Sequence, residues 1–402
     1  MNSIVGNSKS KSMVEKTAQV IFTVCAFFAV LAVISITAYM IISGTPALSQ
    51  VGIAELLFGT VWKPTAADPS YGILYVILTS IVGTTMAIIL GVPIGVSTAI
   101  FLAETASKRL AAIVRPAIEL LAGIPSVIYG LLGIMLLCPA MYKLEQVIFA
   151  NSTTHQFTGG ANLLSAVIVL AIMILPTVIN ISESALRSVP SSLKAASLAM
   201  GASEIQTIFK VILPAAKSGI VTAIVLGVGR AIGEAMAISL VSGSSVNAPF
   251  PFNSVRFLTT ALVSEMGYAS DLHRQVLFTI GLVLFAFIMF INLGLTRIYD
   301  KKIRPSDYVL KGLIYLAAAF SILLLIAIMG YVFVRGIPQI TWQFLTTAPS
   351  TIKGTFGIAG NILNTLYIIV ITLLIATPLG VGSAIYLNEY AKPGRLVRLI
   401  EF

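Results

Sequence analysis

The stretch GVGRAIGEAMAI, residues 227–238, places an arginine and a glutamate inside the apolar run Ile220–Val241. A run of this length crosses the roughly 30 Å hydrocarbon core of a bilayer as a helix. Each charge costs about 2.5 to 3.5 kcal/mol at the centre of a membrane helix, so neither is expected to be incidental. Arg230 and Glu234 are four residues apart, and the spacing therefore predicts that they share a helix face and pair.

Apolar runs recur along the whole chain. Its 402 residues are 57% hydrophobic and 10% charged, with a mean hydropathy of +0.99. The runs lack the alternation of barrel strands, which favours helices. The sequence predicts an all-α, polytopic membrane helical bundle with eight spans, near residues 18–42, 72–102, 117–138, 163–181, 219–242, 275–296, 312–334 and 358–387.

The distribution of basic residues predicts the orientation. Of the 25 lysines and arginines, 18 fall on the side of the N-terminus, six fall on the opposite side and Arg230 lies in the membrane. Basic residues concentrate on the cytoplasmic side of membrane proteins. We therefore expect a multi-pass membrane protein with residues 1–16 in the cytoplasm. The positive charge indicates orientation and gives no reason to expect nucleic acid.

The sequence offers no sign of covalent chemistry. Cys25 and Cys138 lie in apolar spans near opposite faces and predict neither a disulfide nor a metal site. His155 and His273 fall in outside loops without clustered carboxylates and are expected to be surface residues. We expect no catalytic residue, cofactor or metal. Because the chain has no Walker-type phosphate loop, any nucleotide hydrolysis is expected in another chain.

An internal repeat divides the chain. PIGVSTAIFLAE (93–104) and PLGVGSAIYLNE (378–389) are identical at seven of twelve positions, at an offset of 285. The pattern predicts a six-span unit (17–296), a basic cytoplasmic linker (297–311) and the first two spans of a second unit (312–402). Because the second copy stops four spans early, we expect a fragment or a truncated gene, inert for transport by itself.

The loop between the fourth and fifth spans, within residues 187–217, reads SSLKAASLAMGASEIQTIFKVILPAA from Ser191 to Ala216. Leu193, Ala196 and Met200 share one face of a first short helix, which glycine ends at position 201. A capping box of Ser203 and Gln206 opens a second one. Two short helices at an angle suit docking into a groove of a soluble partner.

This loop resembles the coupling loop of the permease subunits of ATP-binding-cassette importers. The family pattern is Glu-Ala-Ala, three residues, Gly, nine residues, Ile, any residue, Leu-Pro. The sequence departs from it at Ala195, where glutamate is usual, and at Ser197. The resemblance implies contact with the ATPase by the loop residues Lys194, Ala195, Ala196, Gly201, Ala202, Leu213 and Pro214.

Three further segments narrow the resemblance. LAGIPSVIYGLLG (121–133), PIGVSTAIFLAE and GRAIGEAMAI together are similar to the C-type permease of phosphate-specific transport, and the second copy is similar to the start of its A-type partner. The resemblance implies a fused permease of a bacterial or archaeal cytoplasmic (inner) membrane, with its pathway between two halves. The implied partners are a cytoplasmic cassette ATPase dimer, an extracytoplasmic phosphate-binding protein, the lipid bilayer and, for completeness, a further permease chain.

Four residues are candidates for the substrate pathway. A guanidinium suits phosphate oxygens, so Arg230 is expected to meet the anion while Glu234 holds it in the anion's absence. Ser126 and Tyr129 put polar atoms beside a break expected at Gly123-Ile124-Pro125. The alternative for the charged pair is a structural salt bridge, and for the break a packing kink.

Two other functions remain open at this point. One is a permease of the same type for sulfate, molybdate or tungstate. The other is a secondary transporter driven by an ion gradient, with Glu234 as a proton site.

Overall fold

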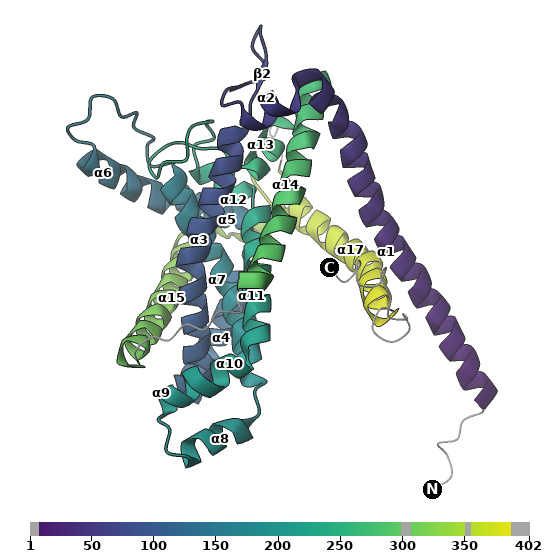
Figure 1. The fold of residues 1–402 in the computed structure, drawn as a ribbon, viewed down its shortest axis with the longest axis vertical. Coiled ribbons are helices and arrows are strands. Elements are labelled where there is room, and N and C mark those ends of the chain that lie inside the picture. Colours follow the sequence, from purple (N-terminus) through teal and green to yellow (C-terminus); the bar gives the residue numbers. More distant parts are fainter. Residues whose placement is uncertain (1–7, 299–306, 350–354, 387–402) are drawn as a thin grey trace. The chain divides into compact units, whose positions relative to one another are not determined.

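The computed structural model describes residues 8–298, 307–349 and 355–386 (Figure 1). The chain divides into two compact units, residues 43–332 and residues 1–42 with 333–402. Apart from a two-stranded antiparallel hairpin, the described elements are helices. This confirms the all-α class.

The larger unit contains α2 (Ile53–Phe58), β1 (Trp62–Lys63), β2 (Ser70–Tyr71), α3 (Leu74–Ile100), the π-helical η1 (Phe101–Thr105), α4 (Lys108–Gly123), α5 (Ser126–Leu132), the π-helical η2 (Gly133–Leu137), α6 (Cys138–Ile148), α7 (Leu163–Arg187), α8 (Ser191–Ala199), α9 (Glu204–Thr207), the π-helical η3 (Ile208–Ile212), α10 (Leu213–Ala215), α11 (Lys217–Gly233), α12 (Met236–Val241), α13 (Leu258–Glu265) and α14 (Asp271–Ile298). Two long helices, α1 (Ser8–Val51) and α15 (Asp307–Gly336), have residues in both units. The smaller unit adds the 3₁₀ turn η4 (Ile337–Gln339), α16 (Trp342–Thr346) and α17 (Ala359–Ile385).

Seven of the described helices are long and apolar enough to cross a membrane, and a bent pair raises the number to eight. The seven are Lys16–Val51, Leu74–Thr105, Ser126–Ile148, Leu163–Arg187, Asp271–Ile291, Gly312–Gln339 and Ala359–Ile385, and the bent pair is Glu204–Ala215 with Lys217–Gly233, at 71°. The polytopic prediction is confirmed. The third span begins later than expected, because Lys108–Gly123 forms the separate helix α4.

Helix α7 forms the centre of the larger unit, where α3 and α11 pack against it (Figure 1). Glycines bring α3 close: a methyl group on Gly95 would lie 2.8 Å from Val178 Cγ1 and 3.0 Å from Val178 Cβ, and one on Gly91 would lie 2.7 Å from Ile174 Cδ1. Gly227 of α11 meets the other methyl group of Val178, where an added carbon would lie at 2.8 Å. Small residues allow such close helix packing in lipid, where helices gain no hydrophobic driving force from association.

A buried polar contact joins α3 to α15 within the same unit. The hydroxyls of Thr98 and Ser321 lie 2.9 Å apart, and the Thr98 hydroxyl also donates to Ile94 O at 2.8 Å. Phe101 and Tyr315 meet edge to face beside this contact, with ring centroids 5.4 Å apart. The start of α15 is thereby fixed on the surface of α3.

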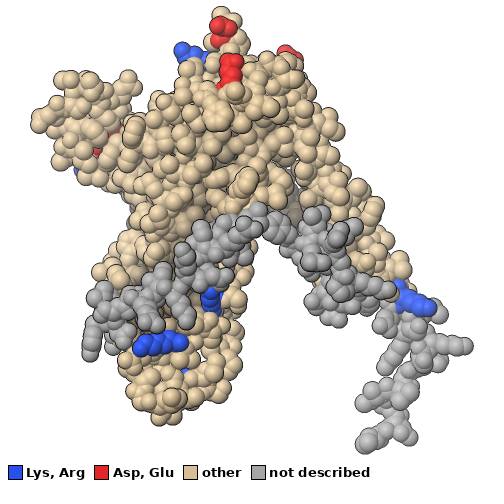
Figure 2. All heavy atoms as spheres, in the orientation of Figure 1, with Lys and Arg blue, Asp and Glu red and all other residues tan. Residues whose placement is uncertain are grey.

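The larger unit has two different ends. Helices α8 and α9 project from one, while the hairpin, α2 and α13 lie at the other (Figure 1). On the face drawn in Figure 2, charged side chains are visible at both of these ends, and most of the uncovered surface between the ends carries none. This pattern is the one expected of a bundle that meets lipid between two aqueous faces.

The internal repeat extends to backbone geometry. Helices α3 and α17 both have 27 residues, and their first residues, Leu74 and Ala359, keep the offset of 285. Each first residue donates its N–H to a loop carbonyl, Leu74 to Gly59 O at 3.0 Å and Ala359 to Thr347 O at 3.1 Å. The two segments therefore enter their helices in the same way.

A methyl group added at Gly95 should destabilise the bundle. It would press on Val178 Cβ, an atom that no rotamer change moves away, and overpacking of this kind costs about 1 to 3 kcal/mol. We expect Gly95→Ala to lower the thermal unfolding temperature of the detergent-purified protein. Gly229→Ala is the matched control, since an added carbon there meets no atom within 4 Å. Equal unfolding temperatures for both variants would contradict the proposed role of the glycine contact.

Candidate functional site

The stretch that carries Arg230 and Glu234 is broken in the structure. Helix α11 ends at Gly233, Glu234 has extended backbone angles (φ −73°, ψ 129°), and α12 begins at Met236. The break lies inside the apolar run Ile220–Val241 and interrupts the expected fifth span. Non-helical backbone at membrane depth occurs where it is buried in protein or lines a water-filled cavity.

Arg230 lies half-buried in the last turn of α11, where the helix dipole favours a cation. Its Nη1 donates to the hydroxyl of Thr177 on α7 at 3.2 Å. Within the described ranges, no carboxylate lies within 4 Å of the guanidinium. The hydrogen-bond partner that the structure gives this cation is therefore a neutral hydroxyl.

The predicted pairing of Arg230 with Glu234 is wrong. The spacing of four residues brings side chains together only on a continuous helix, and the helix ends between them. Glu234 instead turns to α12: its Oε1 accepts the N–H of Ala237 at 2.9 Å. Its main-chain carbonyl accepts the hydroxyl of Thr259 at 2.7 Å. Glu234 therefore supports the break and the start of the next helix.

The third span is broken where the sequence indicated. Helix α4 ends at Gly123 and α5 starts at Ser126, with Pro125 as the residue before it. The Tyr129 hydroxyl donates to Leu121 O at 2.7 Å across this break and is buried. Ser126 is partly exposed at the first position of α5. Neither Tyr129 nor Ser126 forms a hydrogen bond with Arg230 in the part of the chain that the structure describes.

The loop between α7 and α11 has the expected form. Gly201 adopts φ +85°, a backbone conformation that favours glycine, and it separates α8 from the capping box of Ser203 and Gln206. The second helix runs through α9, η3 and α10, and Pro214 lies in its last turn. A bond of 2.9 Å between the hydroxyls of Ser197 and Thr207 holds the two arms together.

Helix α8 is exposed to solvent along its length. None of its residues is buried, and just after it Met200 is 89% exposed. Ala195, Ala196, Gly201 and Pro214 are exposed, while Ala202 and Leu213 are partly buried. Lys194 points inward, and its Nζ lies 2.6 Å from Glu104 Oε2 in η1. The loop is thus joined to the end of α3 while its apolar face stays uncovered.

The expectation that His155 and His273 are surface residues is wrong. The Nε2 of His155 lies 2.8 Å from Glu145 Oε1, and the Nε2 of His273 lies 2.8 Å from Glu265 Oε2. Both carboxylates are buried. Each glutamate is only about ten residues from its histidine in the sequence, and this nearness is a signal that the sequence reasoning missed.

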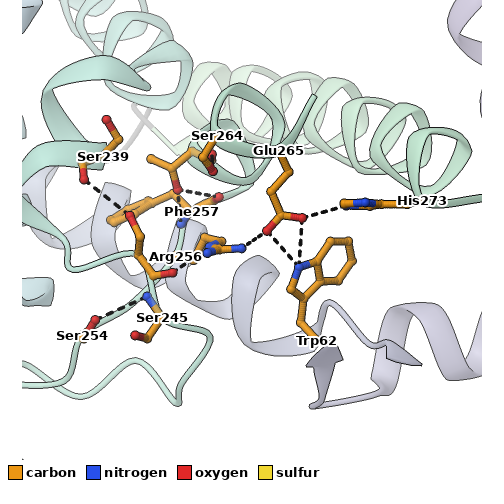
Figure 3. A network of polar contacts seen from close by, with 11 residues as sticks. Trp62, Ser239, Ser245, Ser254, Arg256, Phe257, Ser264, Glu265 and His273 are labelled. Carbon is orange, nitrogen blue, oxygen red and sulfur yellow. Dashed lines mark hydrogen bonds and ion pairs between the residues drawn. The ribbon is translucent and has the colours of Figure 1, made fainter. Parts of the chain in front are cut away.

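The Glu265 network joins four elements of the larger unit (Figure 3). Trp62 Nε1 donates to both carboxylate oxygens, at 3.1 and 3.2 Å, and Arg256 forms an ion pair with Oε1. Arg256 Nε also donates to Ser244 O at 2.8 Å. This buried glutamate therefore holds the hairpin, the loop before α13 and the start of α14 together.

Comparisons with known proteins agree with this arrangement. A family model described as "Binding-protein-dependent transport system inner membrane component" matches residues 91–305. The chain belongs to this family. It is the permease subunit of an ATP-binding-cassette importer, a multi-pass inner membrane protein, and ATP hydrolysis belongs to a separate component. Membership also implies a binding protein among its partners.

Individual proteins similar to this chain have more specific names than the family model. The chain is 36% identical over 298 residues to the "Probable ABC transporter permease protein YqgH" of Bacillus subtilis (strain 168), covering 72% of this chain and 93% of that one. It is 32% identical to the "Phosphate transport system permease protein PstC" of Xylella fastidiosa (strain 9a5c), covering 71% and 91%. A solved structure of the MetNI methionine ABC transporter aligns with a TM-score of 0.39 at 21% identity, covering 61% of this chain and 94% of that one.

Removal of the Glu265 charge should destabilise the protein. Glu265→Gln leaves Arg256 largely buried without its partner, and breaking a buried ion pair costs about 3 to 5 kcal/mol. We expect a lower unfolding temperature in detergent. Glu55→Gln, an exposed carboxylate on α2, is the control and should unfold as the unmodified protein does. A Glu265→Gln protein as stable as this control would show that the network contributes little.

Proposed function

We propose that this permease carries inorganic phosphate into the cytoplasm, with Arg230 in its substrate pathway. The observation that carries the proposal is the cation itself: Arg230 lies half-buried among neutral groups, with its charge unpaired by any described carboxylate. The competing explanation is a structural salt bridge with Glu234, and it is disfavoured because the helix ends between the two residues and Glu234 binds Ala237 instead. An unpaired guanidinium in a low-dielectric site is costly unless an anion completes it.

The surroundings of Arg230 suit an oxyanion. A guanidinium offers five donors in a planar fork, and Thr177 uses one of its nitrogens. The Thr177 hydroxyl that accepts from Arg230 is neutral and leaves the charge of the guanidinium uncompensated. Tyr129 donates its proton to Leu121 O, so its hydroxyl would reach the anion only by releasing that bond. Glu234 acts in this proposal as the support of the helix break and not as a partner of the arginine. Ser126 would contribute at the neighbouring break.

Phosphate is favoured over other oxyanions by the relatives. Several are named phosphate transport system permeases, at 30 to 34% identity. A permease of this type for sulfate, molybdate or tungstate uses the same chemistry and remains the rival. A secondary transporter with Glu234 as its proton site is disfavoured, because family membership implies an ATPase and a binding protein.

The orientation and the coupling loop form the second part of the proposal. We infer that the N-terminus and the α8–α9 end lie in the cytoplasm, as the excess of basic residues on that side predicts. There the bare face of α8, with Met200 and its neighbours, docks on a cassette ATPase dimer. The binding protein meets the opposite end.

The repeated geometry of α3 and α17 supports a further proposal. We infer that residues 312–402 begin a second permease unit, A-type in character, after a linker at 297–311, part of which lies outside the described residues. The support is the shared helix length and the shared hydrogen bond at each helix start. In this proposal the pathway lies between two permease units.

Substitution of Arg230 tests the substrate site. In cells that contain the ATPase component, the binding protein and any further permease chain, Arg230→Gln should lower uptake of labelled phosphate by at least roughly tenfold. Hydrogen bonds to charged groups are worth about 1.5 to 3 kcal/mol each, and the anion loses several. Arg230→Lys keeps the charge without the fork and should keep part of the activity.

Two controls make the Arg230 result specific. Glu234→Gln keeps an oxygen that accepts the Ala237 N–H, so the break should survive and uptake should fall less than in Arg230→Gln. Unlabelled sulfate, molybdate and tungstate should compete poorly with labelled phosphate. Equal competition by sulfate would favour the rival substrate, and normal uptake by Arg230→Gln would remove the arginine from the pathway.

A charge on the bare face of α8 tests the coupling loop. Met200→Asp should reduce co-purification of the ATPase component, because a carboxylate would be desolvated at the centre of an apolar contact. Met200→Leu keeps the apolar contact and should retain the ATPase. Phe250→Asp introduces the same charge on an exposed side chain of the loop after α12 and serves as control. Undiminished ATPase recovery with Met200→Asp would exclude this face as the dock.

A further inference from the structure

A cavity of about 450 Å³ lies beside the turn that joins η1 to α4. Its apolar lining comes from Leu102, Ala103, Ala106 and Ala111, and its polar lining from three cations, Lys108, Arg115 and Arg187. Lys108 and Arg115 are seven residues apart on α4 and so share a face, while Arg187 ends α7. None of these side chains belongs to the proposed substrate pathway, and none is among the loop residues expected to contact the ATPase.

Arg115 and Arg187 both form ion pairs with the buried carboxylate of Glu183. Arg115 Nε and Arg187 Nε both donate to Oε1 of Glu183, at 2.5 and 2.9 Å. Glu183 is 5% exposed and does not line the cavity, whereas both arginines do. The carboxylate therefore fixes the guanidinium groups without occupying the space in front of them.

The cations keep unused donors. Arg115 places one terminal nitrogen 3.4 Å from Leu102 O. The terminal nitrogens of Arg187 have no protein partner among the residues that the structure describes. Three cations and one carboxylate leave two positive charges at the cavity. Guanidinium forks and a lysine together form a common site for phosphate oxygens.

The position of the cavity indicates which anions reach it. Glu104 of η1, next to the lining residue Ala103, binds Lys194 of α8, so the cavity lies at the coupling-loop end of the unit. Arg187 is ten residues beyond Thr177, or about 15 Å along α7, and this separates the cavity from Arg230. In the proposed orientation, phospholipid headgroups and free phosphate are both present at this surface.

We propose that this cavity binds a phosphate group, carried by an anionic lipid headgroup or present as inorganic phosphate, at a site separate from the transport pathway. Lys108, Arg115 and Arg187 contact the phosphate oxygens, and Glu183 is a positioning residue. Basic pockets near the cytoplasmic ends of membrane helices recognise lipid headgroups by this chemistry.

The test measures binding to the purified full chain in two arms. In the first, native mass spectrometry counts phosphatidylglycerol against phosphatidylcholine retained from mixed micelles. In the second, equilibrium dialysis measures labelled inorganic phosphate. We expect retention of the anionic lipid or of inorganic phosphate, and the arm that responds identifies the source. Lys108→Gln and Arg187→Gln should each weaken that binding roughly tenfold, because each removes a charged donor.

Arg109→Gln is the matched control, since Arg109 is exposed on the same helix, carries the same charge and does not line the cavity. Arg187→Lys keeps the charge and should retain part of the binding, which separates loss of a ligand contact from misfolding. The proposal is overturned if neither ligand binds, or if Arg109→Gln weakens binding as much as the two cavity variants.

Discussion

The close contact of α3 and α11 with α7 is the constraint on which the rest of the larger unit depends. In lipid, apolar surface gives helices no reason to associate, so packing must come from backbones that approach closely. Gly95 and Gly227 meet opposite methyl groups of Val178, and this one side chain sets the distance of both neighbouring helices. Thr177 precedes Val178, and Arg230 follows Gly227 by one turn. The contact that packs the bundle therefore also brings the guanidinium to its hydroxyl partner.

Two interrupted helices then give the interior its chemistry. The break after Gly123 brings the Tyr129 hydroxyl to a carbonyl of the preceding helix, and the break after Gly233 frees Glu234 to bind the N–H of Ala237. In each case a local hydrogen bond compensates for helix bonds that are lost, as a low-dielectric interior requires. As a result, Arg230 lies at the end of α11 while the Glu234 carboxylate binds the first turn of α12.

Features that depend on neighbouring residues were predictable from the sequence. The apolar runs, the capping box at Ser203 and the turn at Gly201 each follow from composition or spacing within a short window. The Arg230–Glu234 pair failed because helical spacing predicts contact only if the helix continues, and no proline marks the break at Gly233. The Glu265 network was missed because Trp62 and Arg256 reach the carboxylate only after the bundle has formed. The cavity beside α4 likewise joins residues far apart in the chain.

The ion pair between Lys194 and Glu104 joins the loop between α7 and α11 to the packed part of the larger unit. No residue of α8 is buried, yet this charge pair of 2.6 Å links α8 to η1. The helix α3, which η1 continues, packs closely on α7 through its glycines. A displacement of α8 would therefore act on α3 through a direct charge contact. Because the link is ionic and partly exposed, it is also detachable: salt screens it, whereas the glycine contacts behind it are insensitive to ionic strength. The link between α8 and η1 should therefore weaken as the salt concentration rises, while the packing of α3 on α7 stays unchanged.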